Sequence, residues 1–113
     1  MSQVIQNVNT AFVQNQILNA NSQISKWPVI LLFGHNQCSA CPLAKDTLQR
    51  LALNYAGRIV VYYVDTMQNQ QVANQFGIRA VPTAILFKNG QALEQIVGVA
   101  DYYRYNRMIG SYI

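Results

Sequence analysis

Charge is scarce in this chain. Only 11% of the 113 residues are charged, and eight Lys and Arg against four Asp and Glu give a formal net charge of +4. The cations stand apart along the sequence, whereas a nucleic-acid face needs clustered cations that displace counterions along the phosphates. We therefore expect no nucleic-acid partner, and a polar surface built largely from Asn and Gln.

Long apolar runs are also missing. The longest, Pro28–Gly34, is far shorter than the ~20 residues that a membrane helix needs. The start of the chain, "MSQVIQNVNT", has neither the charged beginning nor the apolar block of a secretory signal. These absences predict no membrane association and a cytoplasmic location.

Cysteine and histidine are limited to one short stretch, "HNQCSACPLAK" at 35–45, which holds Cys38, Cys41 and His35. In a reducing compartment, two cysteines more often serve redox or metal chemistry than structure. The three side chains could give zinc three ligands, but a closed structural zinc site needs four. Because the chain has no other cysteine or histidine, we expect no metal here.

What the chain does contain is an alternation of strand and helix patterns, with an apolar content of 51% that suits one domain over residues 1–113. In the first half of the chain we expect an edge strand at 4–8, a helix capped by Thr10, a buried strand at 27–33, and a long helix with Leu43, Thr47, Leu51 and Tyr55 on its apolar side. In the second half we expect a strand at 59–64, a short helix at 70–76, strands at 83–87 and 92–97 around an Asn89-Gly90 turn, and a last helix capped by Asp101. Right-handed crossovers make the early strands parallel and the hairpin makes the last pair antiparallel. The predicted fold is α/β, with a central mixed β-sheet flanked by helices on both faces.

The cysteines lie where this fold turns from a strand into a helix. Cys38 follows the buried strand and stands at the mouth of the long helix, where free backbone N–H groups and the helix dipole stabilise a thiolate. Cys41 lies one turn further in, close enough for a disulfide. The pair could therefore supply a nucleophile (Cys38) and a resolving thiol (Cys41), although two inert structural cysteines stay an alternative. His35 could lend positive charge to the thiolate, and Ser39 could donate a hydrogen bond to it.

A second pattern lies downstream, in "FGIRAVPTAILFKNGQALEQIVGV" at 76–99. Its Gly-Ile-Arg approach, Val-Pro-Thr segment, apolar strand, Lys-Asn-Gly turn and final Val-Gly, together with "CSAC", closely resemble the thioredoxin family over essentially the whole chain. The resemblance implies a thioredoxin fold and a thiol–disulfide oxidoreductase that exchanges protein disulfides through a Cys38–Cys41 redox pair. It also implies protein disulfide substrates, a reductase or another dithiol for regeneration, no metal or organic cofactor, and a role in cell redox homeostasis. We expect a monomer.

The resemblance assigns three further site residues. Pro82 should follow a cis peptide bond and pack against the cysteine pair, and the backbone of Val81 should pair with an extended substrate segment. Gly98 should lie beside the same groove, where a side chain would obstruct the substrate. An ordinary loop proline and a plain glycine turn are the alternatives at Pro82 and Gly98.

Departures from the family pattern surround the same site. Gln37 and Pro42 stand where thioredoxins have tryptophan and lysine, and Leu32 stands at the position of the family's buried aspartate. Leucine cannot accept a proton from the second cysteine, and the accompanying lysine is replaced near Val61. These departures motivate a second hypothesis, a non-catalytic or weakly active thioredoxin-like binding or accessory module with the tyrosine-rich end "DYYRYNRMIGSYI" as its partner surface.

Overall fold

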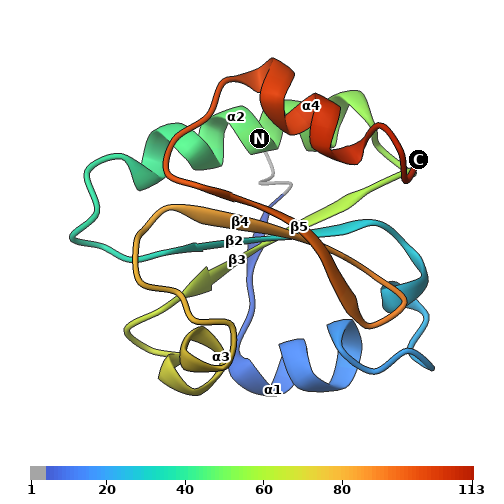
Figure 1. The fold of residues 1–113 in the computed structure, drawn as a ribbon, viewed down its shortest axis with the longest axis horizontal. Helices are drawn as coiled ribbons and strands as arrows, with labels where there is room; N and C mark the ends of the chain where they lie inside the picture. The colour runs from blue at the N-terminus through green and yellow to red at the C-terminus, as the bar shows by residue number, and fades with distance from the viewer. Residues whose placement is uncertain (1–4) are drawn as a thin grey trace.

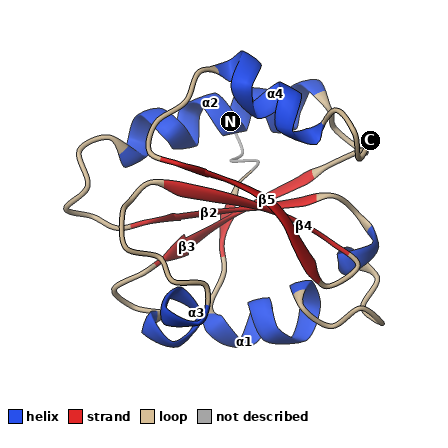
Figure 2. Cartoon of the chain, in the orientation of Figure 1, coloured by secondary structure: helices blue, strands red, loops and turns tan. Residues whose placement is uncertain are grey.

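A five-stranded sheet lies between two layers of helices (Figures 1 and 2). It is seen in a computed structural model that describes residues 5–113. The elements are β1 (Gln6–Asn7), α1 (Thr10–Phe12) continued by a π-helical segment (Val13–Ile17), a 3-10 turn (Ile24–Lys26), β2 (Val29–Gly34), α2 (Cys41–Asn54), β3 (Val60–Asp65), α3 (Gln70–Gln75), β4 (Thr83–Lys88), β5 (Gln91–Val97) and α4 (Tyr102–Ile109). The strand order is β1-β3-β2-β4-β5.

The directions of the strands confirm the predicted mixed sheet. β1 and β2 run parallel to β3, whereas β4 runs antiparallel to both β2 and β5. Helices α2 and α4 cover one face, and α1 and α3 cover the other (Figure 1). All six residues of β2 are buried, which explains the continuous apolar run that marks a strand covered on both faces.

Alternate residues of β2 enter different cores. Ile30 and Leu32 belong to the core under α2 and α4, together with Leu48 and Tyr105. Val29, Leu31 and Phe33 belong to the core on the side of α1 and α3. The period of two along the strand therefore divides its side chains between the two helix layers.

The predicted apolar side of α2 is largely right, with one error. Ala44, Leu48 and Leu51 are buried, and Thr47 is 5% exposed. Leu43 is 58% exposed, because the helix turns it away from the sheet beside the buried Ala44. A stripe of one residue every four drifts around a helix with 3.6 residues per turn, so its first member leaves the core.

The start of β2 and the cap of α1 also differ from expectation. β2 begins at Val29, since Trp27 ends the 3-10 turn and is 39% exposed. Asn9, not Thr10, caps α1: its side chain accepts a hydrogen bond from the Phe12 N–H at 2.9 Å. Thr10 is the first helical residue, and its own N–H donates to Asn69 Oδ1 at 2.9 Å.

The remaining boundaries agree with the sequence. Asp101 caps α4 by accepting from the Arg104 N–H at 2.9 Å. The Asn89-Gly90 turn is confirmed, with φ of 56° and 81° at its two residues. The predicted edge strand is present as Gln6–Asn7, and its expected start at Val4 lies outside the described residues. Among residues 5–113, no helix has the length and apolar character needed to cross a bilayer.

Candidate functional site at the carboxyl end of β2

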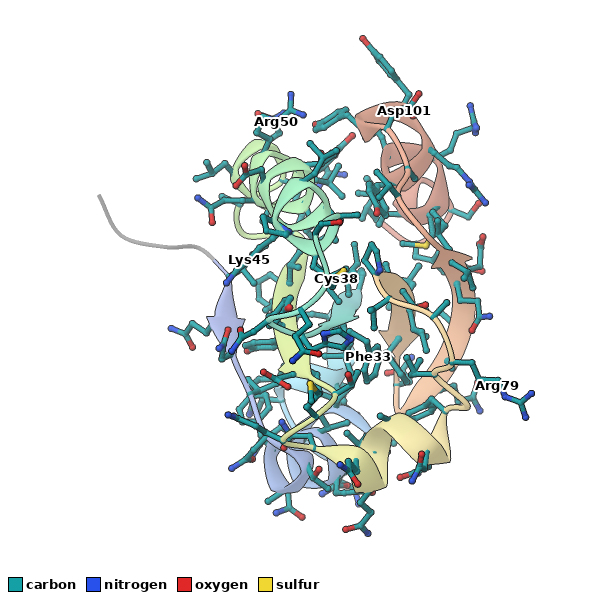
Figure 3. All side chains as sticks on the ribbon, turned by 90° about the vertical axis from the view of Figure 1, so that its left-hand side faces the viewer. Phe33, Cys38, Lys45, Arg50, Arg79 and Asp101 are labelled. Atoms are coloured by element: carbon teal, nitrogen blue, oxygen red, sulfur yellow. A yellow bond between two sulfur atoms is a disulfide. The ribbon has the colours of Figure 1, made fainter. Side chains whose placement is uncertain are left out.

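Cys38 and Cys41 form a disulfide where β2 passes into α2. β2 ends at Gly34, a loop follows, and Cys41 is the first residue of α2. The two Cα atoms are 5.4 Å apart, within the usual range for a disulfide. Cys41 is 2% exposed, whereas Cys38 is only partly covered and reaches the end of the sheet that faces the viewer in Figure 3.

The loop places Cys38 before the start of the helix. Its N–H donates to the His35 carbonyl at 3.3 Å, and the Cys41 N–H donates to the Cys38 carbonyl at 3.3 Å. Ala40 is the N-cap and supplies no side-chain acceptor, and the first turn carries no acidic residue. The positive end of the helix is thus not offset by a local carboxylate, and it favours an anion at the cysteines.

The two predicted modulators, His35 and Ser39, lie in this loop. Within residues 5–113, neither side chain forms a hydrogen bond with a cysteine sulfur. His35 Nδ1 accepts a hydrogen bond from the Gln37 N–H at 3.1 Å. Ser39 is exposed in the same loop.

Strand register fixes the position of Pro82 relative to β2. Thr83 pairs with Phe33, which sets the preceding Pro82 next to the end of β2. The Val81–Pro82 bond is cis, Pro82 is buried and Val81 is partly exposed. The Gly98 N–H donates to the Pro82 carbonyl at 2.7 Å.

Gly98 has a φ of 83°, a backbone conformation that glycine adopts without strain. A Cβ atom built there would meet nothing within 4 Å. The space beside Gly98 is therefore open, next to two exposed apolar side chains, Val97 (53%) and Val99 (43%). Leu43, the residue predicted to be in the core, lines a depression together with Val99 and Tyr102.

The sequence did not reveal the residue that lies beside Leu32. Leu32 pairs with Tyr63, whereas Val61 pairs with Ile30. A Cβ atom on Gly34 would collide with both the Tyr63 hydroxyl and Cys41 Sγ. Burial, reinforced by the negative charge of Asp65, raises the pKa of Tyr63. The alternation of residues along β3 was a usable signal, but it needed the register against β2.

A metal site is not assembled by these side chains. The two cysteine sulfurs are bonded to each other, and His35 Nδ1 is engaged with the loop backbone. Over residues 5–113, no group of three or more His, Cys, Asp and Glu side chains is placed to hold a metal ion.

Comparison with known proteins agrees with this geometry. The thioredoxin family model matches residues 4–110. Thioredoxin 1 of Nostoc sp. is 39% identical over 71 residues, which cover 63% of this chain and 66% of that protein. Thioredoxin M-type, chloroplastic, of Spinacia oleracea is 34% identical over 94 residues, 83% of this chain and 49% of that protein.

A third relative, thioredoxin of Griffithsia pacifica, is 30% identical over 95 residues, which cover 84% of this chain and 82% of that protein. The chain spans about half to two thirds of the length of the first relatives it matches. The fold, the disulfide at the strand-to-helix junction and the match over nearly all of the chain lead to one conclusion: the chain belongs to the thioredoxin family.

Proposed function

We propose that this protein is a thiol–disulfide oxidoreductase that exchanges protein disulfides through Cys38 and Cys41, with residues 1–113 acting as one thioredoxin-like domain. The observation that carries the proposal is the disulfide itself, between a partly exposed Cys38 and a buried Cys41 at the start of α2. A reversible disulfide needs one sulfur that a substrate can reach and a second that only the first can reach.

The reaction proceeds in two exchanges. The Cys38 thiolate attacks one sulfur of a substrate disulfide, that S–S bond breaks, and the other substrate sulfur leaves as a thiolate that takes a proton from solvent. Cys41 then loses its proton and attacks Cys38 Sγ, which releases the first substrate sulfur and closes the Cys38–Cys41 bond. Two electrons pass from the cysteine pair to the substrate.

The substrate is an extended segment of a protein, held beside the cysteine pair. The backbone of Val81 pairs with it, Pro82 packs against the cysteines, and Gly98 leaves room for it. Support comes from the open space at Gly98, the hydrogen bond from Gly98 to Pro82 and the exposed Val97 and Val99 beside them. Apolar surface of this kind suits contact with a protein partner.

Regeneration needs a reductase or another dithiol, because the pair holds a disulfide after each turnover. The role is cell redox homeostasis, in a monomer that uses no metal or organic cofactor. His35 and Ser39 remain candidate modulators of the Cys38 thiolate, by charge and by hydrogen bonding.

The cytoplasmic location of the protein stays a prediction, because the relatives include proteins named as chloroplastic. Cell fractionation would test it.

The second hypothesis, a non-catalytic binding module, is not favoured by a cysteine pair that closes a disulfide in this position. Part of the tyrosine-rich end belongs to the hydrophobic core, since Tyr105 is buried in the core and Tyr112 packs against the core. Only Tyr103, at 73% exposure, stands far out from α4.

The deciding experiment is the reduction of insulin by dithiothreitol, with the wild type compared with Cys38→Ser. We expect the wild type to accelerate reduction and Cys38→Ser to give the uncatalysed rate. Cys41→Ser, the matched control, should instead accumulate a mixed disulfide with the substrate. Equal acceleration by wild type and Cys38→Ser would remove the oxidoreductase from consideration.

A further inference from the structure

The Tyr63 hydroxyl and Cys41 Sγ both border the space that Gly34 leaves open. A Cβ atom on Gly34 would lie 2.8 Å from Cys41 Sγ and even closer to the Tyr63 hydroxyl. Both atoms therefore lie within 3.0 Å of the same point beside Gly34. With any larger residue at Gly34, one or both of these side chains would have to move.

Strand register holds the tyrosine in this place. Tyr63 pairs with Leu32, and the next residue of β2 on the same face is Gly34. The ring packs against the core between the sheet and α2, and the side chain as a whole is only partly buried. Its hydroxyl end therefore approaches the start of α2, where Cys41 lies.

A cation lies over the Tyr63 ring. Lys45 Nζ is 4.8 Å from the centre of the Tyr63 ring, one helical turn after Cys41 on α2. Titratable groups on the elements next to Cys41 include Lys45 on α2, Tyr63 and Asp65 on β3, and His35 and Cys38 in the preceding loop. Of these, Tyr63 is the one whose polar atom shares the Gly34 space with the sulfur.

The chemistry of resolution makes this contact useful. Before Cys41 can attack Cys38 it must give its proton to water and become a thiolate, which is costly for a buried sulfur. A phenol O–H that donates a hydrogen bond stabilises a thiolate more than a thiol and so lowers the thiol pKa. The phenol stays protonated through this step, and the departing substrate thiolate takes its proton from solvent.

We propose that the Tyr63 hydroxyl is the hydrogen-bond donor that stabilises the Cys41 thiolate during resolution. Tyr63 thus acts at the sulfur where Leu32 offers no polar group. Burial and Asp65, which raise the pKa of Tyr63, keep its proton in place at neutral pH. The inference rests on the proposed function for its role in turnover, whereas its effect on Cys41 is measurable without turnover.

The test uses Cys38→Ser, in which Cys41 is the only thiol. Its alkylation rate by iodoacetamide across a pH series gives the pKa of Cys41. We expect Cys38→Ser/Tyr63→Phe to react about three- to tenfold more slowly at neutral pH, because the charge-assisted hydrogen bond is lost. The plot of alkylation rate against pH should move to higher pH, and the rate at high pH, where Cys41 is fully ionised, should stay the same.

Tyr62→Phe is the matched control. Tyr62 is the neighbouring tyrosine of β3, pairs with Leu31, and packs on the opposite core with its ring centroid 5.0 Å from that of Phe12. Adding this substitution to Cys38→Ser should leave the alkylation curve in place. An unchanged curve with Tyr63→Phe, or an equal shift with Tyr62→Phe, would overturn the proposal.

A second measurement retains Tyr63, so its result does not depend on whether the Tyr63→Phe variant folds. In Cys38→Ser with labelled tyrosine, the Tyr63 ring Cζ resonance should shift as Cys41 titrates, and a constant resonance contradicts the proposal.

In turnover, Tyr63→Phe with both cysteines should accumulate mixed disulfide after acid quenching, with its first attack unchanged. Activity retained in Cys38→Ser would overturn the proposed function alone, whereas an unchanged Cys41 alkylation curve in Cys38→Ser/Tyr63→Phe would overturn the role of Tyr63, so the two proposals fail separately.

Discussion

Cys38 and Cys41 are three positions apart, but their surroundings differ. Cys41 is 2% exposed under the first turn of α2, whereas Cys38 lies in the preceding loop and is partly exposed. Access and thiolate stability both control the reactivity of a thiol. The environment of each sulfur, and not the motif alone, therefore sets which cysteine meets a reagent first.

This difference predicts selective alkylation of the reduced protein. With limiting iodoacetamide at neutral pH, Cys38 should react at least about tenfold faster than Cys41, since a buried thiol is both shielded and harder to ionise. Mass spectrometry of the peptides at successive times would measure both rates. Cys38→Ser and Cys41→Ser report each remaining thiol by itself, and equal rates for the two would contradict the assignment.

At the scale of single elements, the turn of the β4–β5 hairpin needs a glycine at Gly90 for two reasons, its backbone conformation and the lack of space for a side chain. Gly90 has a φ of 81°, and a Cβ atom there would lie 2.6 Å from the Leu18 carbonyl oxygen. Gly57, after α2, has a φ of 83° but would meet nothing within 4 Å. The same backbone conformation is thus crowded at one position and open at the other.

This contrast predicts two different costs for alanine. Gly57→Ala should lower the free energy of unfolding by about 1–2 kcal/mol, the cost of a left-handed conformation for a residue with a Cβ. Gly90→Ala should lower it by about 1–3 kcal/mol more, because the backbone of Leu18 must move. Urea denaturation of both variants would measure the difference. Equal losses would mean that the hairpin yields without straining the segment after α1.

The caps show which element boundaries the sequence can predict. Asp101 was identified as the cap of α4, because an acidic residue stands alone before an apolar helical pattern. Before α1, Asn9 and Thr10 are both good caps, and the sequence favoured the wrong one. Asn69, which is distant in the sequence, accepts a hydrogen bond from the Thr10 N–H, and Thr10 is the first residue of the helix rather than its cap.

At the scale of the whole molecule, tyrosine burial links folding to alkaline pH. The pKa values of Tyr62, Tyr63, Tyr105 and Tyr112 are raised above 10.0, in each case chiefly by burial. The folded protein therefore holds these protons more tightly than the unfolded chain. Their contribution to stability is complete below pH 10.0 and is lost as the pH rises through the folded pKa values.

We accordingly expect the free energy of unfolding to fall as the pH rises above 10.0. Urea denaturation of the oxidised protein, in which the disulfide cysteines do not titrate, would measure it together with tyrosinate absorbance. Tyr105→Phe should make the fall shallower, because this fully buried ring then has no proton to lose. Stability that is constant or rises over this range would contradict the prediction.

Local patterns in the sequence were enough for the order of the elements, the mixed sheet, the hairpin turn and the position of the cysteine pair. Each follows from side-chain periodicity, from glycine and proline, or from a spacing within one helical turn. The tertiary structure alone decided that Leu43 is outside the core, that Cys41 is buried while Cys38 is partly exposed, and that the Tyr63 hydroxyl and Cys41 Sγ both lie beside Gly34. These depend on the register of β3 and β4 against β2 and on the rotation of α2 about its axis, which are set only when distant segments pack together.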